Sequence, residues 1–133
     1  MRIPEEPNKY PHAELTREII GAAIAVQKAL GPGMDEKLYE NALCIELSDR
    51  GISFAQQSEY PVHYKERFIG KLIPDLIIEG VVIIELKVAD SFSPAHDAQV
   101  LGYLAATGLP LGLLLNFKVI PLGKRRILAP KKR

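Results

Sequence analysis

The chain has 133 residues, of which 47% are hydrophobic and 25% are charged, and its formal net charge is +1 at pH 7. This composition is typical of one soluble globular domain, and the small net charge gives no overall signal for a polyanionic partner. The single cysteine, Cys44, excludes an internal disulfide and suits a reducing cytoplasm, where we expect the protein to act.

Neither the N-terminus nor the longest uncharged stretch predicts a membrane segment. The polar, proline-rich start predicts an extended arm over residues 1–12 and not a signal peptide. Residues 100–117 carry no charge over the length of a membrane span, but two glycines and a proline interrupt them. Six of the 17 basic residues lie among the last ten positions, so residues 129–133 are expected to form a basic tail, either solvated or in contact with phosphates.

The first part of the chain predicts two helices. Apolar residues recur at three- and four-residue steps from Ala13 to Leu30, which indicates an amphipathic helix that the Gly-Pro-Gly sequence at 31–33 ends. Asp35 is a suitable N-cap for a second helix over about residues 36–50. Glu36 lies in its first turn, where the helix dipole favours a carboxylate, so this position alone explains Glu36 without a catalytic role.

The middle of the chain predicts strands. Residues 52–60 are expected to form one strand and residues 61–64 a short extended piece, before a polar turn at 65–67. Two buried strands follow between Leu72 and Val88, joined at Glu79-Gly80, because aliphatic and β-branched residues fill both arms around a turn signal.

A third helix is expected from Ser93-Pro94, an N-cap followed by proline, to Gly108. Residues 111–117 predict a further buried strand, and residues 119–122 and 127–128 an edge hairpin. The order of helices and strands predicts a mixed α/β fold with helices packed on a central sheet, in one domain of residues 13–128.

Three charged residues interrupt the buried hairpin: Asp75 in its first strand, and Glu85 and Lys87 in its second. Ionisable groups are costly to bury unless they are paired or bind a metal. Glu85 and Lys87 are two residues apart on one strand, so their side chains point to the same face. Whether Asp75 joins them depends on the register of the hairpin, because a slip of one residue reverses every side chain.

Two registers remain open. A two-residue loop at Glu79-Gly80 sets Asp75 opposite Ile84, so the two carboxylates point to opposite faces. A three-residue loop pairs Ile78 with Val82 and sets Asp75 opposite Glu85, and Gly80 can supply the positive φ that such a bulged turn needs. A functional site requires the second register.

In that register, two carboxylates face each other within reach of one ion. Hard oxygen ligands with open positions for water suit Mg²⁺ or Mn²⁺ better than zinc. A neighbouring protonated lysine can hold a water molecule or stabilise negative charge on a phosphate. This set fits metal-assisted hydrolysis of a phosphodiester, and the competing interpretation is a set of buried ion pairs without a catalytic role.

Three motifs in sequence order resemble one superfamily. Pro74-Asp75, nine further residues and Glu85-Leu86-Lys87 are similar to the signature of the PD-(D/E)XK nucleases. The segment GMDEKLY at residues 33–39 resembles the GxxExxY element of one bacterial and archaeal family within that superfamily. The similarity continues through residues 93–99 and 114–117, so it extends over about residues 13–128.

The resemblance implies a restriction-endonuclease-like αβββαβ core, with a mixed central sheet flanked by helices. It implies that Asp75, Glu85 and the backbone carbonyl of Leu86 bind Mg²⁺ or Mn²⁺, and that Lys87 positions or activates the attacking water. It also implies that Glu36 reaches the same site from the second helix as a further metal or water ligand.

The third helix supplies three further candidates, because His96, Gln99 and Tyr103 are spaced three and four residues apart on one face. Gln99 and Tyr103 resemble the QxxxY pair of related nucleases, in which the glutamine orients the site and contacts nucleic acid. Tyr103 is equally explained as a buried ring at the edge of the site. His96 is a candidate phosphate contact, and local structure at the helix start explains it equally well.

The expected function is a Mg²⁺-dependent nuclease that acts on DNA through in-line attack by water. The alternative, from a different class, is a module that binds nucleic acid or protein and keeps the nuclease fold without turnover. A domain this small offers little surface for a substrate, so we also expect a homodimer or a larger assembly.

Overall fold

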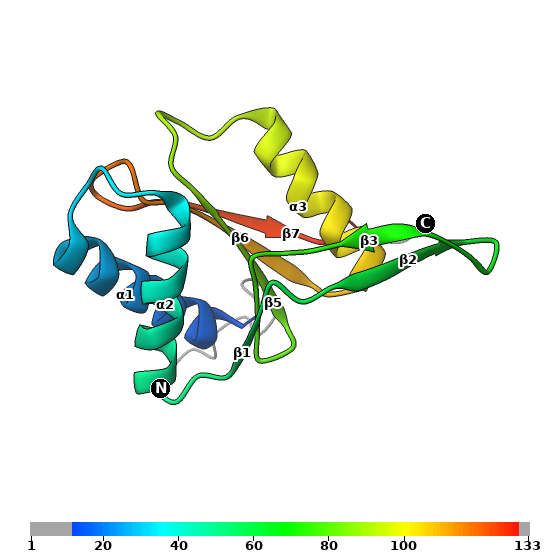
Figure 1. Ribbon diagram of the computed structural model, residues 1–133, viewed down its shortest axis with the longest axis horizontal. Helices are drawn as coiled ribbons and strands as arrows, with labels where there is room; N and C mark the ends of the chain where they lie inside the picture. Colours follow the sequence, from blue (N-terminus) through cyan, green and yellow to red (C-terminus); the bar gives the residue numbers. More distant parts are fainter. Residues whose placement is uncertain (1–11, 131–133) are drawn as a thin grey trace, which may run out of the picture.

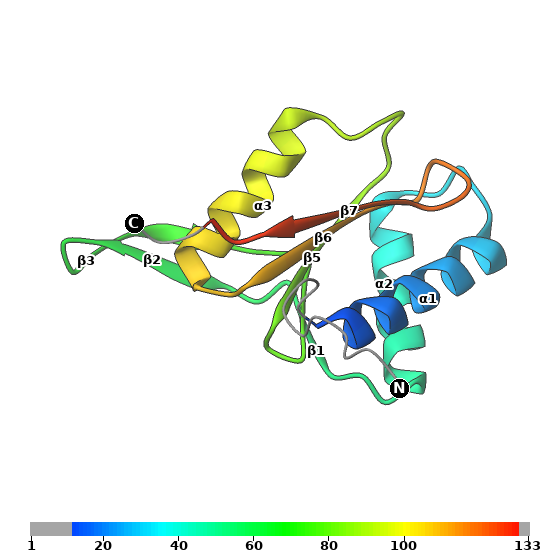
Figure 2. The ribbon, with the colours of Figure 1, turned by 180° about the vertical axis from the view of Figure 1, so that it is seen from behind.

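The computed structural model describes residues 12–130, in which a five-stranded sheet has helices on both faces and a separate two-stranded arm projects from it (Figure 1). Helices α1 (Ala13–Leu30) and α2 (Glu36–Asp49) cover one face, and α3 (Pro94–Thr107) covers the other (Figure 2). Of the expected extended segment at residues 1–12, only residue 12 is described, and of the expected tail at residues 129–133, only residues 129 and 130 are described.

The helices begin and end close to the predicted positions. The side chains of α1 that are buried recur at three- and four-residue steps, and Gly31 (φ 74°) ends the helix with its N–H donated to the carbonyl of Gln27. Asp35 occupies the N-cap position of α2, but its side chain makes no capping hydrogen bond. Ser93 caps α3 as predicted. In the described part of the chain, no helix is long and apolar enough to cross a membrane.

The central sheet has the strand order β1-β4-β5-β6-β7. Strands β5 and β6 are parallel, with α3 as the crossover between them, and the other neighbours in this sheet are antiparallel. The strand bounds are β1 Phe54–Gln56, β4 Leu76–Ile78, β5 Val82–Lys87, β6 Leu111–Asn116 and β7 Gly123–Leu128. This is the predicted mixed sheet flanked by helices.

Successive side chains of β5 point to opposite faces of the sheet, so the strand contributes to two separate layers of the core. Val82, Ile84 and Leu86 pack against α1 and α2, whereas Ile83 packs against α3. Residues Val82 to Leu86 are all buried, because both faces of the strand are covered by helices. Strand β5 is therefore a rigid support for the charged residues at its end.

The hairpin between β4 and β5 adopts the three-residue loop. Ile78 pairs with Val82 and Leu76 with Ile84, which confirms the register that the functional interpretation requires. Glu79 (φ 52°) and Gly80 (φ 67°) both have positive φ, and the N–H of Val81 donates to the carbonyl of Ile78. The expected positive φ at Gly80 is confirmed, and Glu79 shares this conformation.

The single strand expected at residues 52–60 is wrong. Strand β1 ends at Gln56 because Gln57 has a positive φ of 53° and turns the chain. The chain then forms β2 (Tyr60–Tyr64) and β3 (Arg67–Leu72), which pair only with each other within the described residues. We call this hairpin, residues 60–72, the arm.

The edge hairpin expected at residues 119–122 and 127–128 is also wrong. A single strand, β7, pairs antiparallel with β6 along its whole length. The sequence of β7 does not alternate between apolar and polar residues, because Lys124, Arg125 and Arg126 are consecutive charges. Such charges are common on edge strands, where they oppose pairing with another chain. Arg125 pairs with Asp97 at 2.8 Å, and Arg126 donates to Thr16 Oγ1 at 2.9 Å. These two arginines therefore attach β7 to the helices and are not part of a solvated tail.

Gly112 of β6 lies where α3 crosses the sheet, and a Cβ there would overlap Cγ1 of Val100. We expect Gly112→Ala to lower the free energy of unfolding by about 1–3 kcal/mol, because α3 must shift to admit the methyl group. Gly102→Ala, on α3 itself, is the matched control: its Cβ would meet nothing within 4 Å, and alanine favours the helix by up to about 1 kcal/mol. Urea unfolding of both variants tests this, and a Gly112→Ala variant as stable as Gly102→Ala would contradict the packing.

Candidate active site

Asp75 and Glu85 face each other across the base of the β4–β5 hairpin. The backbone N–H of Asp75 donates to Oε2 of Glu85 at 2.6 Å, and the N–H of Leu86 donates to Oδ2 of Asp75 at 2.8 Å. Asp75 directly precedes β4, where the ladder of backbone hydrogen bonds stops, so its N–H is available to a side chain. Each carboxylate is thereby fixed by the backbone of the opposite strand.

Lys87 lies beside this pair and is held by α3. Its Nζ donates to Oε1 of Gln99 at 2.9 Å, and Nε2 of Gln99 donates to the hydroxyl of Tyr103 at 3.1 Å. Gln99 and Tyr103 are one turn apart on α3, so the helix presents both toward the end of β5. The structure therefore brings Lys87, Gln99 and Tyr103 into one hydrogen-bonded chain.

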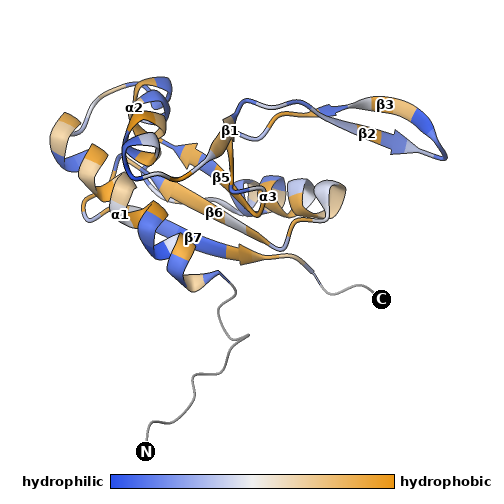
Figure 3. Ribbon diagram, turned by 90° about the horizontal axis from the view of Figure 1, so that it is seen from below, coloured by the Kyte–Doolittle hydropathy of each residue, from blue (hydrophilic) through white to orange (hydrophobic). Residues whose placement is uncertain are grey.

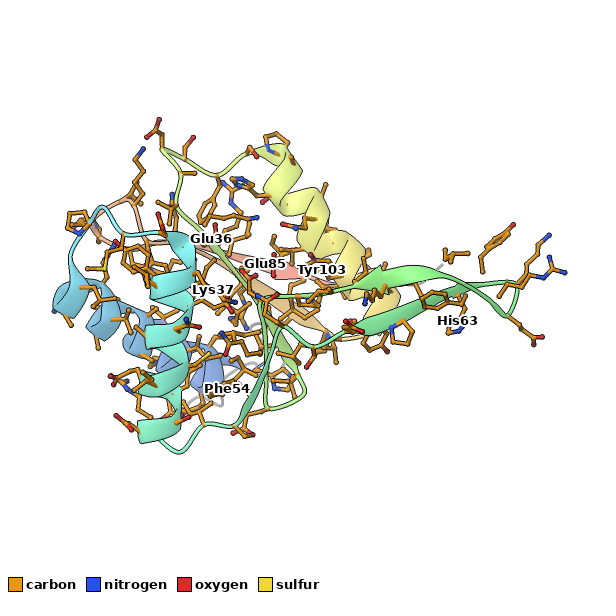
Figure 4. All side chains as sticks on the ribbon, viewed as in Figure 1. Glu36, Lys37, Phe54, His63, Glu85 and Tyr103 are labelled. Atoms are coloured by element: carbon orange, nitrogen blue, oxygen red, sulfur yellow. The ribbon has the colours of Figure 1, made fainter. Side chains whose placement is uncertain are left out.

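Glu36 approaches the site from the first turn of α2. The charges of Asp75 and Lys87 both act on its carboxylate, which shows that the three groups are close. Figure 4 shows Glu36, Glu85 and Tyr103 next to one another in this view, although they come from three different elements. These residues are far apart in the sequence, and they approach one another because α2, β5 and α3 meet here.

His96 takes part in local structure at the start of α3. The N–H of Ser93 donates to its Nδ1 at 3.1 Å, and the N–H of His96 donates to Oγ of Ser93 at 3.3 Å. This reciprocal cap occupies Nδ1, so only Nε2 can contact a phosphate. The contact between His96 and nucleic acid stays a prediction.

Two polar residues with no functional assignment from the sequence, Glu40 and Gln57, border the site. Glu40 is 2% exposed and accepts hydrogen bonds from Lys37 Nζ, Gln56 Nε2 and Gln57 Nε2 at 2.7–3.1 Å. Gln57 also binds Asp75 twice: its backbone N–H donates to the carbonyl at 2.9 Å and its Nε2 to Oδ1 at 3.2 Å. The four-residue spacing of Glu36 and Glu40 was the available sequence signal, because it places both carboxylates on one side of α2.

The carboxyl groups of the site have raised pKa values, chiefly because they are buried. Burial, reinforced by the charge of Asp75, raises the pKa of Glu85 to about 8. Burial also raises the pKa of Asp75, although the hydrogen bond from Leu86 opposes the rise. Burial and the neighbouring Asp75 raise the pKa of Glu36. All three shifts are upward even though Lys87 favours the ionised forms, so a bound cation would favour the ionised form of each carboxylate.

The donor atoms at this site fit a hard divalent cation. Two carboxylates and a neighbouring carbonyl oxygen are a ligand set that Mg²⁺ or Mn²⁺ accepts, with water or phosphate completing the shell. Among residues 12–130, no three His, Cys, Asp or Glu side chains are grouped so that they could hold an ion. Glu36 is therefore not gathered with Asp75 and Glu85 into one such group, and its role as a ligand stays a prediction.

Comparison with known protein families identifies the superfamily of the chain. A model of the PD-(D/E)XK nuclease superfamily matches residues 13–127, and the chain belongs to this superfamily. Such membership supports nuclease chemistry, for which this superfamily generally uses divalent metals. No curated protein matches the chain significantly.

Two solved structures share the fold. The crystal structure of SSO0001 has a TM-score of 0.57 and 18% sequence identity, over 95% of this chain and 63% of that chain. The alkaline exonuclease LHK-Exo from Laribacter hongkongensis has a TM-score of 0.51 and 12% identity, over 90% of this chain and 72% of that chain. The chain thus spans less than two thirds of SSO0001.

Proposed function

We propose that this chain is a metal-dependent nuclease of the GxxExxY family that hydrolyses phosphodiester bonds of nucleic acid, with DNA as the expected substrate. The observation that carries the proposal is the pairing of Asp75 with Glu85 across the hairpin, with Lys87 held beside them. Superfamily membership and the fold that the chain shares with an alkaline exonuclease support it. The free cysteine, buried in α2, is compatible with action in a reducing cytoplasm.

In this proposal, Asp75, Glu85 and the carbonyl of Leu86 hold Mg²⁺ or Mn²⁺, and Glu36 binds the ion or one of its waters. The bound cation supplies Lewis acidity and offsets charge on the phosphate. Lys87 holds the attacking water and stabilises negative charge on the phosphoryl oxygens through its Nζ.

Gln99 has a positioning role in this proposal. Its hydrogen bond holds Nζ of Lys87, and the hydroxyl of Tyr103 fixes the amide in turn. Gln99 is exposed, and in this proposal it also contacts the nucleic acid. Two or more copies of the chain would enlarge the surface available to the substrate.

Metal dependence tests the proposed function. We expect the wild-type protein to cleave a labelled single-stranded or duplex DNA with Mg²⁺ or Mn²⁺ and to be inactive in EDTA, because a bound cation favours the ionised form of the carboxylates. A Glu85→Gln protein purified in parallel controls for contaminating nucleases. Wild-type protein that cuts neither DNA nor RNA with either metal would overturn the enzyme in favour of a binding module.

A further inference from the structure

The arm projects from the body of the protein, and its base adjoins the candidate active site (Figure 1). Strand β3 ends at Leu72, three residues before Asp75. At the other strand, the hydroxyl of Tyr60 lies 3.4 Å from the carbonyl of Thr107, at the end of the helix that carries Gln99. His63, further along the arm, lies well away from Glu85 in Figure 4.

The outer part of the arm exposes large apolar side chains that the rest of the fold does not cover. Tyr64 is 62%, Phe68 63% and Ile69 64% exposed. Figure 3 shows hydrophobic and hydrophilic stretches next to each other along strands β2 and β3. The ring of His63 contacts Phe68 edge-on, with 5.9 Å between the centroids. Exposed aromatic rings on a basic segment are the groups on which unpaired bases stack.

Cations accompany these rings. The Nζ of Lys65 lies 5.5 Å from the centre of the Tyr64 ring, and Arg67 pairs with Tyr64 across the strands. Lys71 is bound to Glu59 at 2.7 Å. Within residues 12–130, by contrast, Lys65 and Arg67 have no carboxylate partner, so their charges are available to phosphates.

The dimensions of the arm suit a short stretch of nucleic acid. Strand β3 has six residues, which corresponds to about 20 Å. At a rise of about 3.4 Å per nucleotide, this length matches about six nucleotides of a stacked strand. The faces of the bases are hidden in a duplex and open in a single strand, so exposed aromatic rings favour the single strand.

We propose that the outer end of the arm binds the single-stranded part of a nucleic-acid substrate whose remainder reaches the active site. Tyr64 and Phe68, which the register places on opposite faces of the hairpin, stack on bases from the two sides, and Lys65 and Arg67 contact phosphates. This inference rests on the proposed function, because it takes nucleic acid as the substrate. It adds the form of the substrate, unpaired strand, and the surface that selects it.

Fluorescence anisotropy with a labelled single-stranded oligonucleotide of about 12 nucleotides, with Ca²⁺ in place of Mg²⁺, tests the arm directly. We expect Tyr64→Ala/Phe68→Ala to raise the Kd about tenfold or more, because each stacked base is lost as a contact. We expect Lys65→Ala/Arg67→Ala to lower the slope of log Kd against log salt by about 1.4, which is about 0.7 for each lost phosphate contact.

The matched control is Arg17→Ala/Ile45→Ala, which removes one exposed cation and one exposed apolar side chain from α1 and α2. It should bind like the wild type. Because an arm variant can lose its local structure, cross-linking of wild-type protein to a photoreactive single strand provides a second measurement. The cross-linked peptide should fall within residues 60–72.

Three results would overturn the proposal: arm variants that bind the single strand like the wild type, tighter binding of duplex than of single strand, or a wild-type dimer that Phe68→Ala/Ile69→Ala converts to monomer without loss of binding.

Failure of the proposed function gives a different pattern. A protein that binds the single strand through the arm but cuts nothing loses the nuclease proposal and keeps the arm. A protein that cuts DNA equally well with either arm variant keeps the nuclease proposal and loses the arm.

Discussion

A Glu85→Gln variant is expected to lose nuclease activity by about 10³-fold or more and to become more stable than the metal-free wild type at pH 8. The loss of activity follows from removal of one of two facing carboxylates that the proposal assigns to the cation. The gain in stability follows because Glu85 is 3% exposed and its pKa in the folded protein is raised to about 8. Glutamine keeps an oxygen that can accept the N–H of Asp75 and never has to ionise.

The direction of the pH dependence follows from this upward shift. An acid whose pKa rises from 4.5 to about 8 on folding binds its proton more tightly in the folded state. Its contribution to stability is full below pH 4.5 and is lost as the pH rises toward 8, with a slope of up to about 1.4 kcal/mol per pH unit. Asp75 and Glu36 have raised pKa values as well, so the variant keeps part of the same trend.

Urea unfolding of both proteins in EDTA at pH 5 and pH 8 measures the effect. The wild type should lose more free energy of unfolding than Glu85→Gln between the two values, and Mg²⁺ should restore stability at pH 8 to the wild type alone. Parallel pH profiles for the two proteins would contradict the burial of an ionisable Glu85.

Lys87→Met is expected to lower kcat by about 10²–10⁴-fold while metal binding stays intact or becomes tighter. Methionine retains the length of the side chain and removes the Nζ that Gln99 holds at 2.9 Å. Removal of a positive charge next to Asp75 and Glu85 should strengthen binding of a divalent cation, because Lys87 competes with the ion for the same carboxylates.

Single-turnover cleavage and Mn²⁺ titration of the same protein separate these two effects. Lys118→Met is the control: this lysine pairs with Asp90 at 2.6 Å, on the surface, and its loss should leave kcat unchanged. A Lys87→Met protein with more than about a tenth of the wild-type kcat would show that Lys87 is not part of the chemistry.

The parts of the site that lie on regular elements were predictable from the sequence. The bounds of α1 and α3 follow from apolar periodicity with glycine or proline at their ends. For the β4–β5 hairpin the sequence left two registers open, and only the requirement that Asp75 face Glu85 singled out the observed one, with Gly80 able to adopt the loop conformation. The pair of Gln99 and Tyr103 followed from their spacing on one helix.

The other parts of the site could not be predicted, because they depend on hydrogen bonds between residues that are far apart in the sequence. Nothing near Gln57 in the sequence shows that it takes a positive φ, ends β1 and binds Asp75, because its partners lie 17 and 18 residues away. Glu40 resembles any polar residue of an amphipathic helix until two glutamines from another segment meet it. For the arm, the sequence indicated the extended piece at residues 61–64 and the polar turn after it. It did not indicate β3 or the separation of the hairpin from the central sheet, since β2 and β3 do not follow the pattern of burial of that sheet.

Anomalous scattering from crystals grown with Mn²⁺ tests whether Asp75 and Glu85 hold a divalent cation next to Lys87. We expect a peak within about 2.5 Å of a carboxylate oxygen of Asp75, one of Glu85 and the carbonyl oxygen of Leu86. At saturating Mn²⁺, a map with no peak between these residues, both carboxylates still bound only to backbone amides, would contradict it.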